Sequence, residues 1–170
     1  PRTIHSKLYK SIPEKEVEVL GFENTPVLPN LFIRNAVGHL LLDYGMVLEK
    51  GFLQVADEAA ALASQLDLSS PENLDRWHFY KAVEISCKAV SDFGMRYSEF
   101  ARKKAEETAD EARRKELLKI SDVCARVPAY PARDFHEALQ SFWFVQLITQ
   151  IDTDGLAISP GRFDRYMYPY

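Results

Sequence analysis

The sequence predicts a mainly α-helical fold with at most one or two short strands. Apolar residues recur at helical spacing through most of the chain, in stretches too long for ordinary strands. A single segment, 156–159, is the candidate strand. The 170 residues are 46% hydrophobic, which is enough apolar mass for one domain to bury a core.

The first 33 residues form an irregular segment ahead of this helical pattern. Pro13, Pro26 and Pro29 interrupt any long helix there. We expect a short helix near residues 13–20, followed by a loop.

From residue 36 to residue 66 the apolar positions follow a helical period, so most of this stretch is predicted to be helix. Gly38, Gly45 and Gly51 each lower helix propensity by about 1 kcal/mol relative to alanine. Such glycines permit another backbone to approach closely; alternatively, the helix breaks near Gly51. Both interpretations stay open at this point.

A long helix is predicted next. Ser70 can cap a helix and Pro71 fits its first turn. Between residues 79 and 101 an apolar stripe keeps a period of about 3.6 residues. The segment 102–119 carries charges of both signs three and four residues apart, which is typical of a solvated helix face.

Residues 127–131 must form a turn, because residues that precede proline avoid the helical region. A helix is predicted over 132–151, and residues 153–155 end it. This helix is apolar on nearly every side, so we expect other parts of a protein to cover it almost all round.

Composition and charge exclude several classes of function. A net charge of −4 offers no basic face for nucleic acid, and no apolar run is long enough to span a membrane. Cys87 and Cys124 lack the spacing of a metal site or a disulfide framework, so we assign both to the core and expect a reducing, cytoplasmic setting. The chain lacks a start methionine and stops after an aromatic stretch; we expect a truncated chain.

The four histidines do not form a metal-ligand pattern. We interpret His5 and His78 as surface residues and His136 as structural. His39 stands beside Gly38 in an apolar setting, and taken alone it is a satisfied buried histidine.

Several motifs, in this order and at these spacings, carry a family resemblance. They are GHLLLDY at 38–44, VLEKGF at 47–52, RWHFYKA at 76–82, RKELLKI at 114–120, VPAYPARDFHEALQS at 127–141 and ISPGRFDRY at 158–166. From 34 to 170 the chain resembles part of the pyruvate formate-lyase-like domain of glycyl radical enzymes. The similarity is greatest to the dehydratase and lyase branches, such as glycerol dehydratase and choline trimethylamine-lyase.

The resemblance implies the helical N-terminal portion of an α/β barrel and a radical chemistry. In this family a separate activating enzyme, which uses S-adenosylmethionine and an iron–sulfur cluster, installs a radical on a backbone glycine. A cysteine thiyl radical then abstracts a substrate hydrogen. The family's cysteine follows a glycine and precedes Xaa-Glu, a setting that neither Cys87 nor Cys124 has. We therefore assign no catalytic residue, expect no turnover from this chain alone, and expect a homodimeric parent.

The resemblance also implies part of a substrate pocket. A histidine in the position of His39 lines the pocket in the family, and the polyol dehydratases place a His-Ser pair where this sequence has Leu156 and Ala157. Losing those two hydrogen-bonding groups disfavours glycerol as the substrate. We expect a less polar or differently charged substrate, which is anionic if Arg34 turns inward.

The expected function is thus a small-molecule lyase: a dehydratase, a decarboxylase, or an enzyme that breaks a carbon–sulfur or carbon–nitrogen bond. The acyltransferase activity of pyruvate formate-lyase itself is less expected. The alternative is a non-catalytic helical interaction module, which composition alone would favour.

Overall fold

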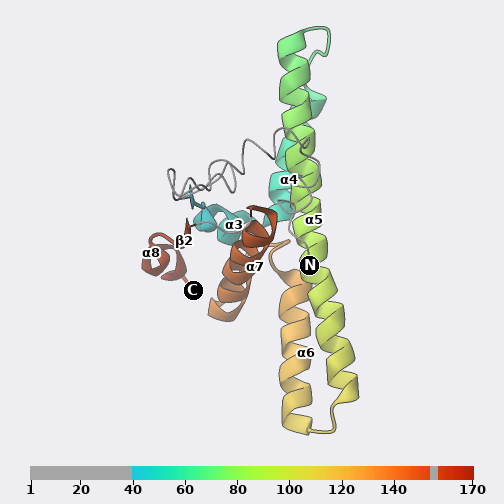
Figure 1. Cartoon of the computed structure of the whole chain (residues 1–170), viewed down its shortest axis with the longest axis vertical. Coiled ribbons are helices and arrows are strands. Elements are labelled where there is room, and N and C mark those ends of the chain that lie inside the picture. Colours follow the sequence, from blue (N-terminus) through green and yellow to red (C-terminus); the bar gives the residue numbers. More distant parts are fainter. Residues whose placement is uncertain (1–39, 154–156) are drawn as a thin grey trace, which may run out of the picture. The chain divides into compact units, whose positions relative to one another are not determined.

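The computed structural model describes residues 40–153 and 157–170 (Figure 1). Helices dominate this part of the chain, and the one small sheet has two strands, so the mainly α prediction is confirmed. The elements are β1 (Leu40–Leu41), α3 (Tyr44–Lys50), α4 (Phe52–Ser64), α5 (Pro71–Glu107), α6 (Glu111–Arg126), α7 (Phe135–Thr153), β2 (Ile158–Ser159) and α8 (Phe163–Met167). The helix expected near 13–20 and the boundary at residue 33 lie outside the described residues.

The chain falls into two compact units, each described by itself below. One consists of residues 1–42 and 146–161, and the other of residues 43–145 and 162–170. The first unit holds the paired strands β1 and β2, and the second holds most of the helices.

In the second unit α5 packs against α4 along one part of its length and against α6 along another (Figure 1). As predicted, α5 begins at Pro71 after Ser70, but the Ser70 hydroxyl caps no backbone N–H and donates instead to the Glu72 carboxylate. The buried positions of α5 are small residues, which let the neighbouring helices approach closely: Cys87, Gly94, Ser98, Ala101 and Ala105. Ser98 and Ser121 join α5 to α6, because the Ser121 hydroxyl donates to the Ser98 carbonyl at 2.9 Å.

The charge pattern of segment 102–119 suggested one continuous helix face, but the structure divides this segment between two helices. The segment breaks at Thr108, whose backbone is extended, and α6 restarts after Asp110. The Asp110 carboxylate accepts hydrogen bonds from the backbone N–H groups of Ala112, at 2.9 Å, and Arg113, at 3.3 Å. The charges themselves are solvent-exposed, as expected.

The prediction of helix over 36–66 is wrong in two respects. The first helix begins later than predicted, and the helical stretch is interrupted. Leu40 and Leu41 form a strand, and α3 begins only at Tyr44, where the Asp43 carboxylate accepts from the N–H of Met46 at 3.0 Å. The break at Gly51 is real: its φ is 76°, and an added Cβ would lie 2.4 Å from the Ala129 carbonyl oxygen. Both interpretations of this glycine are therefore correct.

The turn at 127–131 caps helix α4. Its Pro128 and Ala129 carbonyls accept hydrogen bonds from the N–H groups of Phe52, at 2.9 Å, and Leu53, at 3.0 Å. These N–H groups have no partner within their own helix, so the turn satisfies them from outside. The predicted turn is confirmed, and it fixes where α4 starts.

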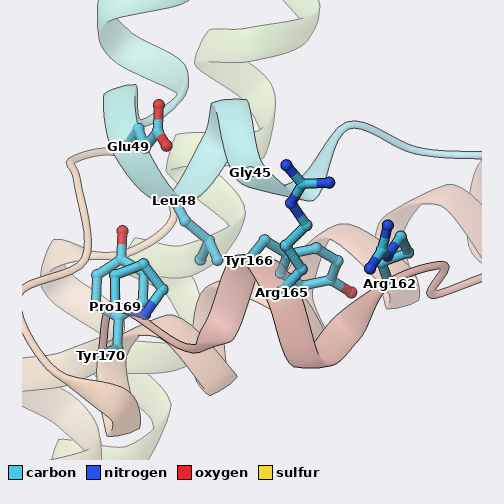
Figure 2. Close-up of a pocket in the computed structure, with 8 residues that line it drawn as sticks. All are labelled: Gly45, Leu48, Glu49, Arg162, Arg165, Tyr166, Pro169 and Tyr170. Carbon is cyan, nitrogen blue, oxygen red and sulfur yellow. The ribbon is translucent and has the colours of Figure 1, made fainter.

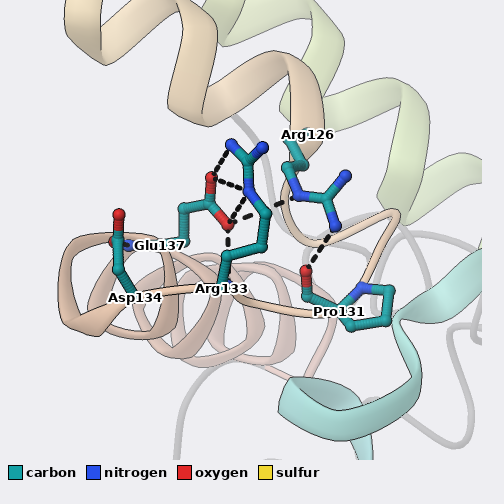
Figure 3. A network of polar contacts seen from close by, with 5 residues as sticks. All are labelled: Arg126, Pro131, Arg133, Asp134 and Glu137. Carbon is teal, nitrogen blue, oxygen red and sulfur yellow. Dashed lines mark hydrogen bonds and ion pairs between the residues drawn. The ribbon is translucent and has the colours of Figure 1, made fainter. Parts of the chain in front are cut away.

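Helix α7 begins at Phe135 rather than at residue 132. The backbone N–H of Arg133 donates to the buried carboxylate of Glu137 at 2.9 Å, and the Asp134 carboxylate accepts from the Glu137 N–H at 2.9 Å (Figure 3). These side-chain hydrogen bonds stabilise a helix start at the end of the turn.

One side of α7 is buried through Ala138, Ser141 and Phe144, while Leu139 and Trp143 are 41% and 55% exposed. Within the described residues α7 is therefore covered on one side, and its cover by other parts of a protein stays a prediction. The two cysteines, by contrast, lie in the core as predicted, and burial raises the pKa of the Cys124 thiol to about 11. A thiol with so high a pKa is a weak nucleophile at neutral pH.

Candidate functional site

The strand pair of the first unit is the part of the described chain that stands nearest in sequence to the predicted pocket residues. β1 and β2 are parallel, with Leu40 paired to Ile158 and Leu41 paired to Ser159. Helix α7 holds the second strand, because the Gln146 side-chain amide donates to the Ile158 carbonyl at 3.3 Å.

Gly161 lies two residues beyond the carboxyl end of β2. Gly161 has φ 65°, and an added Cβ would lie 2.3 Å from Leu41 Cδ1. Only glycine adopts this conformation readily, and only glycine lets the leucine side chain lie so close. The Pro160-Gly161 step of the family motif thus has a local structural reason.

Of the four predicted pocket residues, the structure describes Ala157. It is exposed and has φ 56°, the only positive φ outside glycine in the described residues. A left-handed alanine costs roughly 1 kcal/mol or more, so the surrounding chain must hold it there. Arg34, His39 and Leu156 lie outside the described residues, and their roles stay predictions.

The parallel register gives Ala157 a defined neighbourhood. Because Leu40 and Ile158 are opposite each other, the amino ends of both strands lie at the same edge of the sheet. Ala157 directly precedes β2 at this edge. The residue that precedes Leu40 in the sequence is His39.

The second unit contains a cavity that the sequence did not predict. It has a volume of about 310 Å³ and lies between α3 and α8 (Figure 2). The lining residues are Gly45, Leu48, Glu49, Arg162, Arg165, Tyr166, Pro169 and Tyr170. Figure 2 shows the two arginines toward one end and Pro169 and Tyr170 toward the other.

Aromatic packing forms the floor of this cavity. The ring of Tyr166 stacks on that of Tyr44 at 5.5 Å and meets that of Phe163 at 5.7 Å. Burial, with a smaller effect of Tyr44, raises the pKa of Tyr166 to about 12. Burial and the nearby Glu49 carboxylate also raise the pKa of Tyr170. Both phenols therefore stay neutral at physiological pH.

The only sequence signal for this cavity was the pair Arg162 and Arg165, three residues apart in the motif at 158–166. Arg165 lies in α8, and Arg162 is the residue that directly precedes this helix. In the sequence this motif contributed only to the family resemblance, and its two positive charges predicted no binding site.

Within residues 40–153 and 157–170, no group of three His, Cys, Asp or Glu side chains could hold a metal ion. Over the same residues, no helix is both long and apolar enough to cross a bilayer.

A family model for pyruvate formate lyase-like proteins matches residues 2–170. The chain belongs to the pyruvate formate lyase-like family. An isethionate sulfite-lyase from Bilophila wadsworthia is 36% identical over 99% of the chain, which covers 21% of that protein.

Two solved structures of this family share the fold. A glycerol-bound, B12-independent glycerol dehydratase from Clostridium butyricum matches 81% of the chain at 39% identity and a TM-score of 0.77, over 17% of its own length. A Roseburia inulinivorans protein of 1,2-propanediol dehydration matches 98% of the chain at 38% identity and a TM-score of 0.79, over 21% of its length. The chain thus spans about a fifth of the relatives that it matches.

Proposed function

We propose that this chain acts as part of a glycyl radical lyase, and that it contributes one wall of the pocket for a small organic substrate. The observation that carries the proposal is the family match over residues 2–170, joined to relatives that are lyases and dehydratases by name. The bond broken is a carbon–oxygen, carbon–carbon, carbon–sulfur or carbon–nitrogen bond.

The strand pair supports the choice of wall residues. Ala157 immediately precedes β2, and His39 immediately precedes β1 in the sequence. In a parallel pair the amino ends of the two strands lie at the same edge of the sheet. We therefore keep His39, Leu156 and Ala157 together as proposed substrate contacts, with Arg34 as a further one.

Overall identity does not choose between substrate classes, because a sulfite-lyase and a glycerol dehydratase match at 36% and 39%. The proposed wall does. Leu156 and Ala157 offer no side-chain hydrogen bond, so a pocket built on them leaves substrate hydroxyls unpaired. We propose a less polar or an anionic substrate, the latter paired with Arg34; a crystal structure with Arg34 in bulk solvent would remove the anionic part.

In this proposal no residue of this chain carries the radical. In a glycyl radical enzyme the radical supplies hydrogen abstraction from the substrate. The proposed contribution of this chain is to bind and orient the substrate and to exclude water at its own wall. We further propose a radical activating enzyme that uses S-adenosylmethionine as partner, a homodimeric assembly and a cytoplasmic location.

Substrate profiling of the activated, full-length protein in which this chain occurs tests the proposal. Isethionate, glycerol and 1,2-propanediol are compared anaerobically in the wild type and in the double variant Leu156→His, Ala157→Ser. The wild type should turn over glycerol poorly, and the double variant should raise kcat/KM for glycerol by about tenfold or more, since each restored hydrogen bond contributes about 1 kcal/mol. Efficient glycerol turnover by the wild type would contradict the proposed wall.

A helical interaction module is the second candidate, and the exposed Leu139 and Trp143 favour it. An apolar stripe of this kind is typical of a surface that meets another protein. The discriminating measurement is turnover: a module that only binds partners should show no radical signal and no lyase activity after activation.

A further inference from the structure

The cavity between α3 and α8 has two cationic side chains without a counter-ion in the described part of the chain. Arg162 and Arg165 are exposed, and neither forms an ion pair there. Arg113 and Arg114, by contrast, pair with Glu116 at 2.8 Å and with Glu111 at 2.6 Å, whereas Arg96 on α5 is exposed and has no ion pair in the described residues.

The rest of the cavity is largely apolar. Leu48 and Tyr166 lie beside the arginines, and Pro169 and Tyr170 lie at the other end (Figure 2). Leu48 and Met167 belong to the buried cluster beneath, and Tyr166 and Tyr170 pack against this cluster. A site with packed walls loses little entropy when it binds a ligand.

Charge and size together define the chemistry of a fitting ligand. Guanidinium groups bind carboxylates in a planar, two-pronged geometry. An aromatic or branched apolar group would lie against Tyr166 and Tyr170, whose phenols stay neutral. The volume of about 310 Å³ suits a small molecule or a single residue. Glu49 at the Tyr170 end would repel a second anionic group there.

We propose that this cavity is a binding site for a carboxylate attached to an apolar, preferably aromatic, group. The carboxylate pairs with Arg162 and Arg165, and the apolar group lies on Leu48, Tyr166 and Tyr170. The same chemistry is offered by a free arylalkyl carboxylic acid and by the C-terminal residue of a polypeptide. This site is independent of the lyase activity proposed above, because it needs neither a radical nor the strand pair.

Ligand-observed NMR titration of the full 170-residue chain tests the site. Phenylacetate represents a free acid, and the peptide Gly-Ser-Gly-Ser-Gly-Phe with a free C-terminus represents a polypeptide end. Phenylacetamide and the amidated peptide are the matched neutral probes. Saturable binding of an acid but not of its amide supports the proposal, and the acid that binds more tightly identifies the source.

Three variants place the binding in the cavity. Arg165→Gln should weaken the affinity for the acid by about tenfold or more. Glu49→Gln should strengthen it a fewfold, because a nearby like charge is removed. Arg96→Gln is the control, since Arg96 is an exposed arginine on α5 away from the lining residues.

All three side chains are exposed, so these substitutions leave the core intact, and far-ultraviolet circular dichroism checks that the helices persist. The proposal is overturned if binding of neither acid saturates at concentrations up to about 10 mM, a dissociation constant that corresponds to a binding free energy of about −3 kcal/mol. Equal binding of acid and amide overturns it, and so does an Arg165→Gln chain that binds like the wild type.

Discussion

The buried carboxylate of Glu137 binds Arg133, which lies four residues earlier, through both the backbone N–H and the guanidinium group (Figure 3). Glu137 is 2% exposed, and Arg126 Nε lies 3.4 Å from its carboxylate on another side. Arg126 in turn donates to the Pro131 carbonyl at 3.1 Å. One carboxylate thus connects the end of α6, the turn that caps α4 and the start of α7.

Replacing this carboxylate should destabilise the second unit. Glu137→Gln removes a charge that two arginines share, at a cost of about 2 kcal/mol in the free energy of unfolding. The cost stays moderate because the Arg133 side chain is 66% exposed and can be solvated. Urea unfolding followed by circular dichroism measures it. Glu116→Gln, on an exposed ion pair, should change the free energy by less than about 0.5 kcal/mol.

The same residue predicts a pH dependence. Burial alone would raise the pKa of Glu137, but the hydrogen bonds from Arg133 and the charge of Arg126 outweigh it, so the pKa is lowered below 4.5. Stability from a depressed carboxyl pKa is complete above the unfolded pKa and is lost as pH falls through the folded one. The difference in unfolding free energy between wild type and Glu137→Gln should therefore be full at pH 6 and shrink at pH 3. A constant difference would contradict the assigned network.

Gly51 and Gly45 should respond in opposite ways to substitution by alanine. Gly51→Ala forces a Cβ to 2.4 Å from the Ala129 carbonyl at φ 76°, so we expect a loss of about 3 kcal/mol or more. Gly45→Ala meets nothing closer than 3.6 Å inside α3 and should be neutral or stabilising by up to about 1 kcal/mol. Thermal unfolding of both variants measures the two changes in stability. Equal changes in the two variants would contradict the prediction.

The uncovered side of α7 should promote self-association of the isolated chain. Trp143→Gln should lower light scattering at high protein concentration while changing the unfolding free energy by less than about 1 kcal/mol, because the side chain is 55% exposed. Leu118→Gln is the matched control, an exposed apolar residue on α6 at 41%. Equal effects of the two substitutions would argue against a specific apolar surface on α7.

Local signals predicted much of this fold. Pro71 marks the start of α5, and the two prolines of 127–131 mark the turn, because proline restricts the backbone within a few residues. The strand Leu40–Leu41 was missed since two residues pair only with a segment more than a hundred positions away. The break at Thr108 was missed because the charge pattern continues on both sides of it.

The site was less predictable than the fold. His39, Leu156 and Ala157 came from a family resemblance, and no local pattern distinguishes them from core residues. The cavity with Arg162 and Arg165 was absent from the sequence analysis, because its floor depends on α3 and α8 packing together across a long stretch of chain.

The central claim is that this chain forms a substrate-binding wall in a glycyl radical lyase. The most direct measurement compares the activated full-length protein with its His39→Ala variant, by electron paramagnetic resonance for the radical and by steady-state kinetics for the substrate. We predict equal radical signals and a fall in kcat/KM of about tenfold or more for the variant, since the role proposed for His39 is to bind the substrate and not to form the radical. Absence of any radical in the wild type, or an unchanged kcat/KM in the variant, would contradict the claim.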